Sequence, residues 1–262
     1  MKKSILLMTA LTLSMAVHAR DFEKKTFKSA VTGAELLYRQ LSPEAVDAGK
    51  QAKNGTYPLV LFLHGAGERG SDNTKQLVHG SGMFLNPANA EKYPAYVIFP
   101  QCPENLTWAY DAPHPWGTMP WDLPADAPES TMMKLLVEFL RDFLATHPDV
   151  NTSKVYVMGL SMGGLGTYDI TSRYPELFTA AVPMCGNVNP AKVVGAKSVK
   201  FSIYHGDKDN VVPVEGSREA YRALRASGAK VRYKEFVGCG HGCWDPTFNE
   251  PDLLPWLFKQ KK

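Results

Sequence analysis

The stretch VYVMGLSMGG at residues 155–164 joins an apolar strand pattern to a Gly-x-Ser-x-Gly motif and a helix-like segment. In such a unit the backbone turns sharply at the serine. The glycines two residues before and two residues after it keep Cβ atoms out of the turn. The hydroxyl of Ser161 is then exposed above the edge of a sheet. The stretch therefore predicts a strand, a tight turn and a helix, with Ser161 as a candidate nucleophile.

Three other strand patterns end in loops that suit such a serine. One is followed by HGAG at residues 64–67, one by HGDKDN at 205–210, and one leads to His241 between two glycines. Serine, acid, histidine is the chain order of the triad in the α/β-hydrolase fold. The loop after the His-Gly strand supplies one of the oxyanion donors of that fold. The order of the four motifs thus predicts an α/β-hydrolase fold.

Each candidate then has an expected role. Ser161 attacks the substrate, and His241 takes its proton and later protonates the leaving group. The backbone N–H groups of Met162 and Ala66 are expected to form the oxyanion hole, which stabilises the negative oxygen of the tetrahedral intermediate. Nothing in this arrangement calls for a metal ion.

The motifs resemble those of the α/β-hydrolase superfamily. Within it the chain is similar to a secreted group of carboxylesterases, dienelactone-hydrolase-like proteins and predicted peptidases (phospholipase/carboxylesterases). The resemblance covers most of the chain after the N-terminal hairpin and implies a serine hydrolase that needs no metal or organic cofactor. It rests on HGAGERGSDN at 64–73, PQCP at 100–103, GLSMGG at 159–164, HGDKD at 205–209 with VP at 212–213, and GH at 240–241 with WDP at 244–246.

The acid of the triad has three candidates, Asp207, Asp209 and Asp245. By position Asp207 and Asp209 both fit, although Asp207 also suits a turn in which the carboxylate bonds its own backbone. In sequences of the group that this chain resembles, the acid stands four residues after the histidine of His-Gly, which implies Asp209. His64 and His205, which end strands, are expected to make structural hydrogen bonds.

The rest of the chain alternates between strand and helix patterns. Apolar runs at residues 59–63 and 95–100 are typical of parallel strands covered on both faces. Ser130 is expected to cap a helix at 131–146. The alternation predicts a mostly parallel central sheet with helices on both faces. The other expected elements are a hairpin at 22–40, strands at 155–159, 180–184, 199–204 and 231–237, and helices from 162 to about 174 and at 215–227.

The N-terminus has the pattern of a secretory signal peptide. A basic start, an uncharged run at residues 4–17 and VHA at 17–19 predict a signal peptide over 1–19, cut after Ala19. The run is too short for a transmembrane helix, with a retained anchor as the alternative. Residues 20–262 then form a single catalytic domain that is secreted or periplasmic.

Charge and composition say little in favour of a macromolecular partner. Without Lys2 and Lys3 the formal charge falls from +3 to +1. Such a balance gives no electrostatic case for nucleic acid or for an anionic membrane. The expected partner is a small-molecule or carbohydrate-linked ester, and the sequence predicts no oligomeric state.

The four cysteines, at positions 102, 185, 239 and 243, suit an oxidising compartment. Four cysteines allow three full pairings, and the sequence does not choose among them. One alternative is a local bridge between Cys239 and Cys243, which would stiffen the loop around His241. Another is a zinc site, for which no second pair of ligands is nearby.

Residues 102–128 break the alternation. They contain six prolines together with Trp108, Trp116 and Trp121, so they can form neither a regular helix nor a central strand. Long irregular segments in compact domains are usually functional. The segment is therefore either a stiff flap whose aromatic rings cover the core or a substrate-binding platform on which sugar or aryl rings stack.

The sequence leaves three functions open. The first is a secreted serine hydrolase that cleaves carbohydrate-linked, phenolic or short acyl esters through an acyl-enzyme on Ser161. The second is a serine peptidase related to prolyl oligopeptidases, for which the chain shows neither a propeller nor an evident acidic pair for a peptide amino terminus. The third is a non-catalytic binding protein on the same fold. Glu68 and Arg69 are expected to line the entrance of the site or to form an internal loop network.

Overall fold

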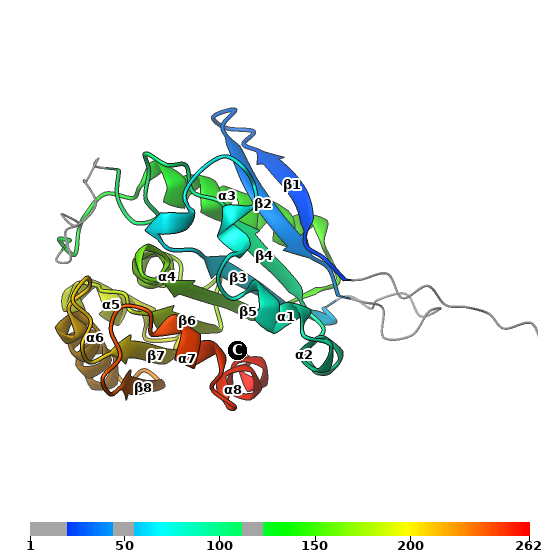
Figure 1. The fold of residues 1–262 in the computed structure, drawn as a ribbon. Helices are drawn as coiled ribbons and strands as arrows, with labels where there is room; N and C mark the ends of the chain where they lie inside the picture. The colour runs from blue at the N-terminus through cyan, green and yellow to red at the C-terminus, as the bar shows by residue number, and fades with distance from the viewer. Residues whose placement is uncertain (1–19, 44–54, 112–122) are drawn as a thin grey trace, which may run out of the picture.

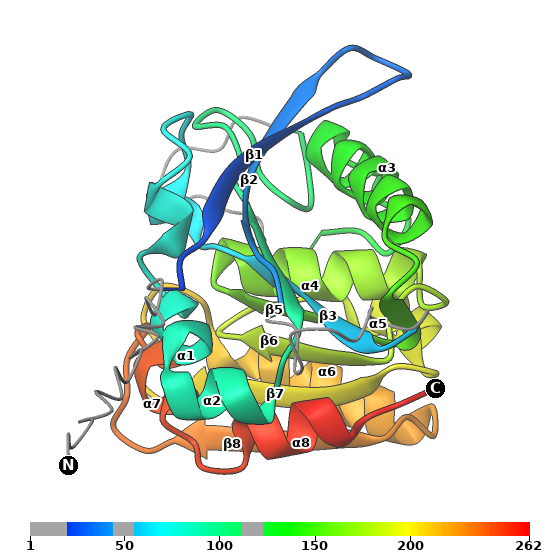
Figure 2. The same cartoon turned by 90° about the vertical axis from the view of Figure 1, so that its right-hand side faces the viewer.

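The computed structural model describes residues 20–43, 55–111 and 123–262. The expected signal peptide and two of the candidate tryptophans, Trp116 and Trp121, lie outside these ranges. The described residues form one sheet with helices on both faces (Figures 1 and 2). No helix in this part of the chain has the length and the apolar character needed to cross a membrane.

Within the described ranges the sheet contains eight strands: β1 (Glu23–Lys28), β2 (Glu35–Leu41), β3 (Tyr57–Leu63), β4 (Tyr96–Pro100), β5 (Val150–Leu160), β6 (Ala180–Met184), β7 (Lys200–Gly206) and β8 (Val231–Phe236). Their order is β1-β2-β4-β3-β5-β6-β7-β8. β1 and β2 form the expected antiparallel hairpin, and β2 also runs antiparallel to β4. All later pairings are parallel. The prediction of a mostly parallel sheet is confirmed.

The helices are α1 (Ser81–Leu85), α2 (Pro87–Lys92), α3 (Thr131–Thr146), α4 (Met162–Arg173), α5 (Pro190–Val193), α6 (Val214–Ala226), α7 (Trp244–Phe248) and α8 (Leu253–Lys259), with short 3₁₀ turns η1 (Ala66–Glu68), η2 (Lys75–Leu77) and η3 (Val194–Ala196). α3, α4 and α6 pack on one face of the sheet, through side chains such as Leu136 and Leu224. α1 and α8 cover the other face, with Phe84 and Leu257 in its core. Successive residues of the central strands alternate between these two cores, as the pleat requires.

The predicted elements are found close to their expected bounds. α3 begins and ends where the sequence predicts, and Ser130 caps it by accepting a hydrogen bond from the N–H of Met133 at 2.9 Å. β5 begins at Val150, earlier than predicted. The polar residues 151–154 interrupt the apolar pattern from which the strand is expected to start at residue 155. The short helices α7 and α8, which follow the last strand, have no counterpart among the predictions.

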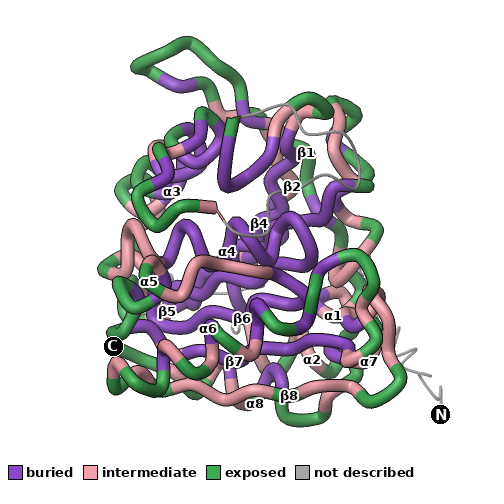
Figure 3. Tube along the Cα trace, turned by 90° about the vertical axis from the view of Figure 1, so that its left-hand side faces the viewer, coloured by how far each residue is buried: buried purple, intermediate pink, exposed green. Residues whose placement is uncertain are grey.

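The carboxyl ends of the parallel strands meet at one edge of the sheet. Figure 3 shows that β6, β7 and the second half of β5 are buried, so the loops that follow them continue directly from the core. β3, β5, β7 and β8 end directly before the loops that carry the four motifs. In a parallel sheet this edge is where ligands bind.

Candidate active site

Ser161 stands at a strained turn between β5 and α4. Its φ of +53° and ψ of −119° lie outside the usual regions for a non-glycine residue. Its N–H donates to the carbonyl of Met184 at 2.9 Å. A methyl group on Gly159 would lie 2.2 Å from the carbonyl oxygen of Gly163, and one on Gly163 would lie 1.9 Å from the carbonyl oxygen of Leu63. The motif needs both glycines because the backbones approach too closely for any side chain.

The structure brings Ser161, Asp209 and His241 together. His241 Nε2 lies 2.8 Å from Ser161 Oγ, and His241 Nδ1 lies 2.8 Å from Asp209 Oδ2. Ser161 is 3% exposed, and the side chain of Asp209 is fully buried. An ionised carboxylate only accepts hydrogen bonds, so Nδ1 of His241 carries the proton and Nε2 is free to accept one.

The carboxylate of Asp209 is held by four donors. Val211 and Val212 each donate a backbone N–H to Oδ1 at 2.9 Å. His205 Nε2 lies 3.2 Å from Oδ2, which His241 also contacts. Burial alone would raise the pKa of Asp209, but the hydrogen bonds from the two histidines and the two backbone N–H groups together hold this pKa well below its ordinary value of 3.8.

The other two acid candidates lie elsewhere. Asp207 Oδ1 accepts the N–H of Gly238 at 2.6 Å, which ties the two loops after β7 and β8 together. Asp245 is exposed on α7. His205, whose Nδ1 lies 2.7 Å from Ser217 Oγ, makes the structural hydrogen bonds that the sequence predicts. Its contact with Asp209 was not foreseen, because it depends on how the loop folds back.

The two expected oxyanion donors flank Ser161. Met162 is the first residue of α4, so its N–H has no acceptor within the helix. Ala66 opens the 3₁₀ turn after β3. A methyl group on Gly65 would lie only 3.6 Å from Ser161 Cβ, so this turn lies directly beside the serine.

Buried contacts of His64 and Trp108 hold the turn after β3 in place. His64 Nε2 accepts the N–H of Cys102 at 3.0 Å, and burial lowers the pKa of the His64 imidazole to about 4, which keeps it neutral. Trp108 is fully buried, and its indole N–H donates to the carbonyl of His64 at 3.0 Å. The expectation that Trp108 binds substrate is therefore corrected: its ring belongs to the core and supports the site from below.

The remaining candidates lie in the same turn. Arg69 Nε donates to the carbonyl of Ala66 at 3.0 Å, which makes Arg69 part of the internal loop network. Glu68 Oε1 lies 3.8 Å from His79 Nε2, and the Glu68 side chain is 13% exposed. The ring of Trp244 packs against both His241 and His79. Trp244 opens the WDP motif at 244–246, but no local pattern indicates its ring contacts or the contacts of His79, because these join loops far apart in the chain.

All four cysteines are free in the structure, so the local bridge between Cys239 and Cys243 is not formed. In the described part of the chain, one group could offer a metal three ligands: Cys185, Asp209 and His241, whose ligand atoms lie within 4.8 Å of one another. However, His241 and Asp209 are hydrogen-bonded to each other, and burial raises the pKa of the Cys185 thiol well above its ordinary value. A neutral thiol is a poor ligand, so this donor set suits the hydrogen-bonded pair better than a metal ion.

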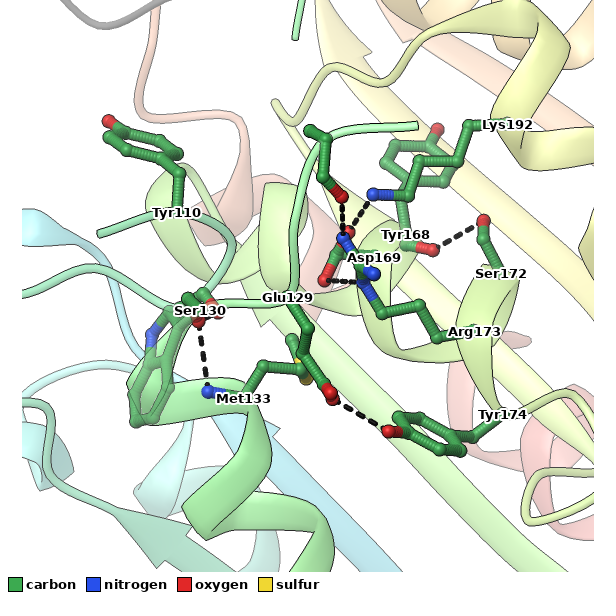
Figure 4. Close-up of polar contacts among 12 residues, drawn as sticks. Tyr110, Glu129, Ser130, Met133, Tyr168, Asp169, Ser172, Arg173, Tyr174 and Lys192 are labelled. Atoms are coloured by element: carbon green, nitrogen blue, oxygen red, sulfur yellow. Dashed lines mark hydrogen bonds and ion pairs between the residues drawn. The ribbon is translucent and has the colours of Figure 1, made fainter. Parts of the chain in front are cut away.

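The far end of α4 carries a buried ionic cluster that the sequence did not reveal. Asp169 is 3% exposed and lies between Lys192 of α5 and Arg173, whose Nε contacts Asp169 Oδ2 at 2.9 Å (Figure 4). Arg173 also donates to the carbonyl of Ala127 at 2.6 Å, and Tyr174 donates to Glu129 at 2.7 Å. These contacts attach the end of the proline-rich segment to α4.

The fold is that of the α/β-hydrolases. The chain belongs to the α/β-hydrolase superfamily, and its residues 126–250 match the Dienelactone hydrolase family. A solved structure described as a thermostable esterase superposes with a TM-score of 0.80 at 35% identity, covering 92% of this chain and 64% of the other.

Two curated relatives extend the comparison. An endo-1,4-beta-xylanase/feruloyl esterase of Xylanibacter ruminicola is 25% identical over 84% of this chain. An uncharacterized secreted protein of Arthroderma benhamiae is 24% identical over 91% of it. The chain spans only 29% and 27% of the length of these two proteins. Each comparison therefore concerns one part of the relative.

Proposed function

We propose that this protein is a secreted serine hydrolase that cleaves carboxylic esters through an acyl-enzyme on Ser161. The observation that carries the proposal is the unbroken hydrogen-bonded chain from Ser161 Oγ through His241 to Asp209. The serine at the head of that chain stands at a strained turn between a strand and a helix. Export rests on the N-terminal pattern, which predicts cleavage after Ala19.

The reaction follows from the polarity of this chain. Nε2 of His241 takes the proton of Ser161 as Oγ attacks the ester carbonyl, and the same proton then passes to the departing alcohol. Asp209, ionised because its pKa is held low, stabilises the imidazolium that forms between these steps. Water attacks the acyl-enzyme in the second half-reaction, with His241 again as base, and the carboxylic acid leaves.

The negative oxygen of each tetrahedral intermediate needs fixed donors. The N–H groups of Met162 and Ala66 are the candidates, since both open helical turns beside Ser161. Arg69 and Trp108 act at one remove, because they bond the carbonyl groups of Ala66 and His64. The removal of one oxyanion donor typically costs about a hundredfold or more in rate.

Carbohydrate-linked, phenolic and short acyl esters are the proposed substrates. The esterase names of the relatives support an ester in preference to a peptide. A serine peptidase is the second candidate, since acylaminoacyl peptidases share the fold at 17% identity. A non-catalytic binding protein is the third, and the complete triad speaks against it.

A paired assay tests the proposal. Wild type and Ser161→Ala would be compared on p-nitrophenyl acetate and on a prolyl peptide p-nitroanilide. We expect ester turnover only, and a loss of about 10⁴-fold or more in the variant. Ser172→Ala is the matched control, because Ser172 lies on the same helix and bonds only the carbonyl of Tyr168. Anilide cleavage at a comparable rate would favour the peptidase, and inactivity on both substrates would contradict catalysis.

A further inference from the structure

A cluster of Glu68, His79 and Trp244 lies beside the triad and has no part in it. The Trp244 ring meets the His241 ring edge to face, with centroids 5.3 Å apart and an interplanar angle of 88°. The centroid of the His79 ring lies 5.2 Å from that of the same Trp244 ring. His79 Nε2 is in turn 3.8 Å from Glu68 Oε1. The cluster thus runs without a break from the proposed general base to the turn after β3.

Glu68 also approaches Ser161 from the side of that turn. A methyl group on Gly65 would lie 3.0 Å from Glu68 Oε2 and 3.6 Å from Ser161 Cβ. The carboxylate and the serine therefore border the same small space above Gly65. The side chains of Glu68 and His79 are 13% and 29% exposed, so the cluster reaches the surface next to the nucleophile.

Two polar atoms of the cluster are buried without a partner. Among the described residues, neither Glu68 Oε2 nor Trp244 Nε1 has a hydrogen-bond partner. Buried polar atoms are almost always paired, and an exception beside a reactive centre calls for an explanation. One of the two atoms accepts hydrogen bonds and the other donates them. Hydroxyl groups, which both donate and accept, would satisfy each of these two atoms.

The position of the cluster shows which part of an ester it would meet. His241 must return its proton to the oxygen of the departing alcohol, so the alcohol lies against His241 Nε2. Trp244 packs on that same imidazole, and Glu68 is connected to Trp244 through the His79 ring. The acyl oxygen, by contrast, points to the N–H groups of Met162 and Ala66. The cluster therefore borders the alcohol part of the ester.

We propose that Glu68 and Trp244 form the subsite for the alcohol part and select alcohols that carry a hydroxyl group close to the ester oxygen, such as glycerol or a sugar. The proposal rests on the ester hydrolysis proposed above and narrows its substrate class. Hydroxyl groups of such an alcohol would donate to the Glu68 carboxylate and accept from the Trp244 indole N–H. A plain alkyl alcohol can do neither and would leave both atoms unpaired.

The test is a ratio of two rates. Glycerol 1-acetate and n-propyl acetate share the acyl group and the carbon count of the alcohol and differ in two hydroxyl groups. The ratio of their kcat/KM values, followed by acid release, is independent of any general loss of activity. Wild type should prefer the glycerol ester by about tenfold or more, since a hydrogen bond to a charged group is worth roughly that much.

Three variants and a control locate the preference. Glu68→Ala should reduce the ratio by about tenfold, and Glu68→Gln, which keeps an acceptor oxygen of the same reach, should reduce it less. Trp244→Phe, which removes the N–H and keeps most of the ring, should also reduce it and serves as the readout if Glu68→Ala does not fold. Glu91→Ala, a change at an exposed glutamate of α2, should leave it unchanged.

The outcomes separate this proposal from the one it rests on. Hydrolysis of both esters with a ratio that is the same in wild type, Glu68→Ala and Trp244→Phe would overturn the subsite and leave the esterase intact. A wild type that prefers propyl acetate would overturn it as well. Hydrolysis of neither ester, together with inactivity on p-nitrophenyl acetate, would contradict the esterase itself and the subsite with it.

Discussion

The two ends of α4 use buried polar residues in opposite ways. At the N-terminal end, the backbone of Ser161 is strained, and its hydroxyl oxygen lies within hydrogen-bond distance of His241 Nε2. Two to three turns further on, Asp169 is also buried, but it is closed in by Lys192 and Arg173. The first end holds the proposed nucleophile at the edge of the sheet. At the second end the charged groups pair with one another, and these contacts join α4 to α5 and to the segment before α3.

The difference teaches where stability and reactivity are expected to reside in this domain. Asp209 is fixed mainly by backbone N–H groups of its own loop and by two histidines, so its removal should affect chemistry first. Asp169 is fixed by two cations whose side chains are 9% and 19% exposed. Its removal would leave these cations buried, and it should affect folding first.

The largest effect should come from Asp209→Asn. The amide would donate to His241 Nδ1 in place of accepting, which favours the wrong tautomer, and kcat/KM should fall by about 10⁴-fold. The control is Asp207→Asn, because Asp207 holds only the N–H of Gly238. Ester turnover by both variants is the measurement. A loss in Asp207→Asn as large as that in Asp209→Asn would contradict the assignment of the acid.

The same substitution should change how stability depends on pH. The pKa of Asp209 is lowered in the folded state, so its ionised form stabilises the fold above its ordinary value of 3.8. This contribution is lost as the pH falls below that value and through the lower folded pKa. Urea unfolding of wild type and Asp209→Asn should therefore show a stability difference at pH 7 that shrinks towards pH 3. A difference that grows in acid would contradict the direction of the shift.

The opposite balance is expected for Asp169→Ala. Leaving Lys192 and Arg173 unpaired should cost about 3–5 kcal/mol, or roughly 10 °C in Tm for a domain of this size. Differential scanning calorimetry of the purified variant measures it. Glu176→Ala is the control, because Glu176 meets Arg141 in an exposed pair at 3.8 Å that is worth little. Equal Tm values for the two variants would show that the cluster is not a stabilising one.

The same contrast explains what the sequence could predict. α3 and the triad motifs are encoded locally, by Ser130 before an amphipathic run and by glycines around Ser161, so their place in the fold was predictable. The Glu68–His79–Trp244 cluster and the Asp169 cluster are contacts between distant loops and helices, which no local pattern records. Trp108 shows the same limit, since its aromatic ring alone does not distinguish a buried core residue from a substrate platform.

The smallest effect should come from Ser130→Ala, at the point where the proline-rich segment enters α3. Ser130 Oγ accepts the N–H of Met133 at 2.9 Å and donates to the carbonyl of Trp108 at 2.7 Å. The loss of such a cap costs about 1 kcal/mol, less than the stranded cations of the Asp169 cluster because no charge is left unpaired. Urea unfolding measures the cost, and Ser130→Thr, which keeps a hydroxyl, should recover most of it. Ser130 bonds the carbonyl of Trp108, and the Trp108 indole in turn bonds the carbonyl of His64, so the kcat/KM of Ser130→Ala should also fall. The fall should be smaller than that of Asp209→Asn, because Ser130 touches none of the triad residues. A loss of activity as large as that of Asp209→Asn, with no loss of stability, would mean that this cap belongs with the reactive end of α4 after all.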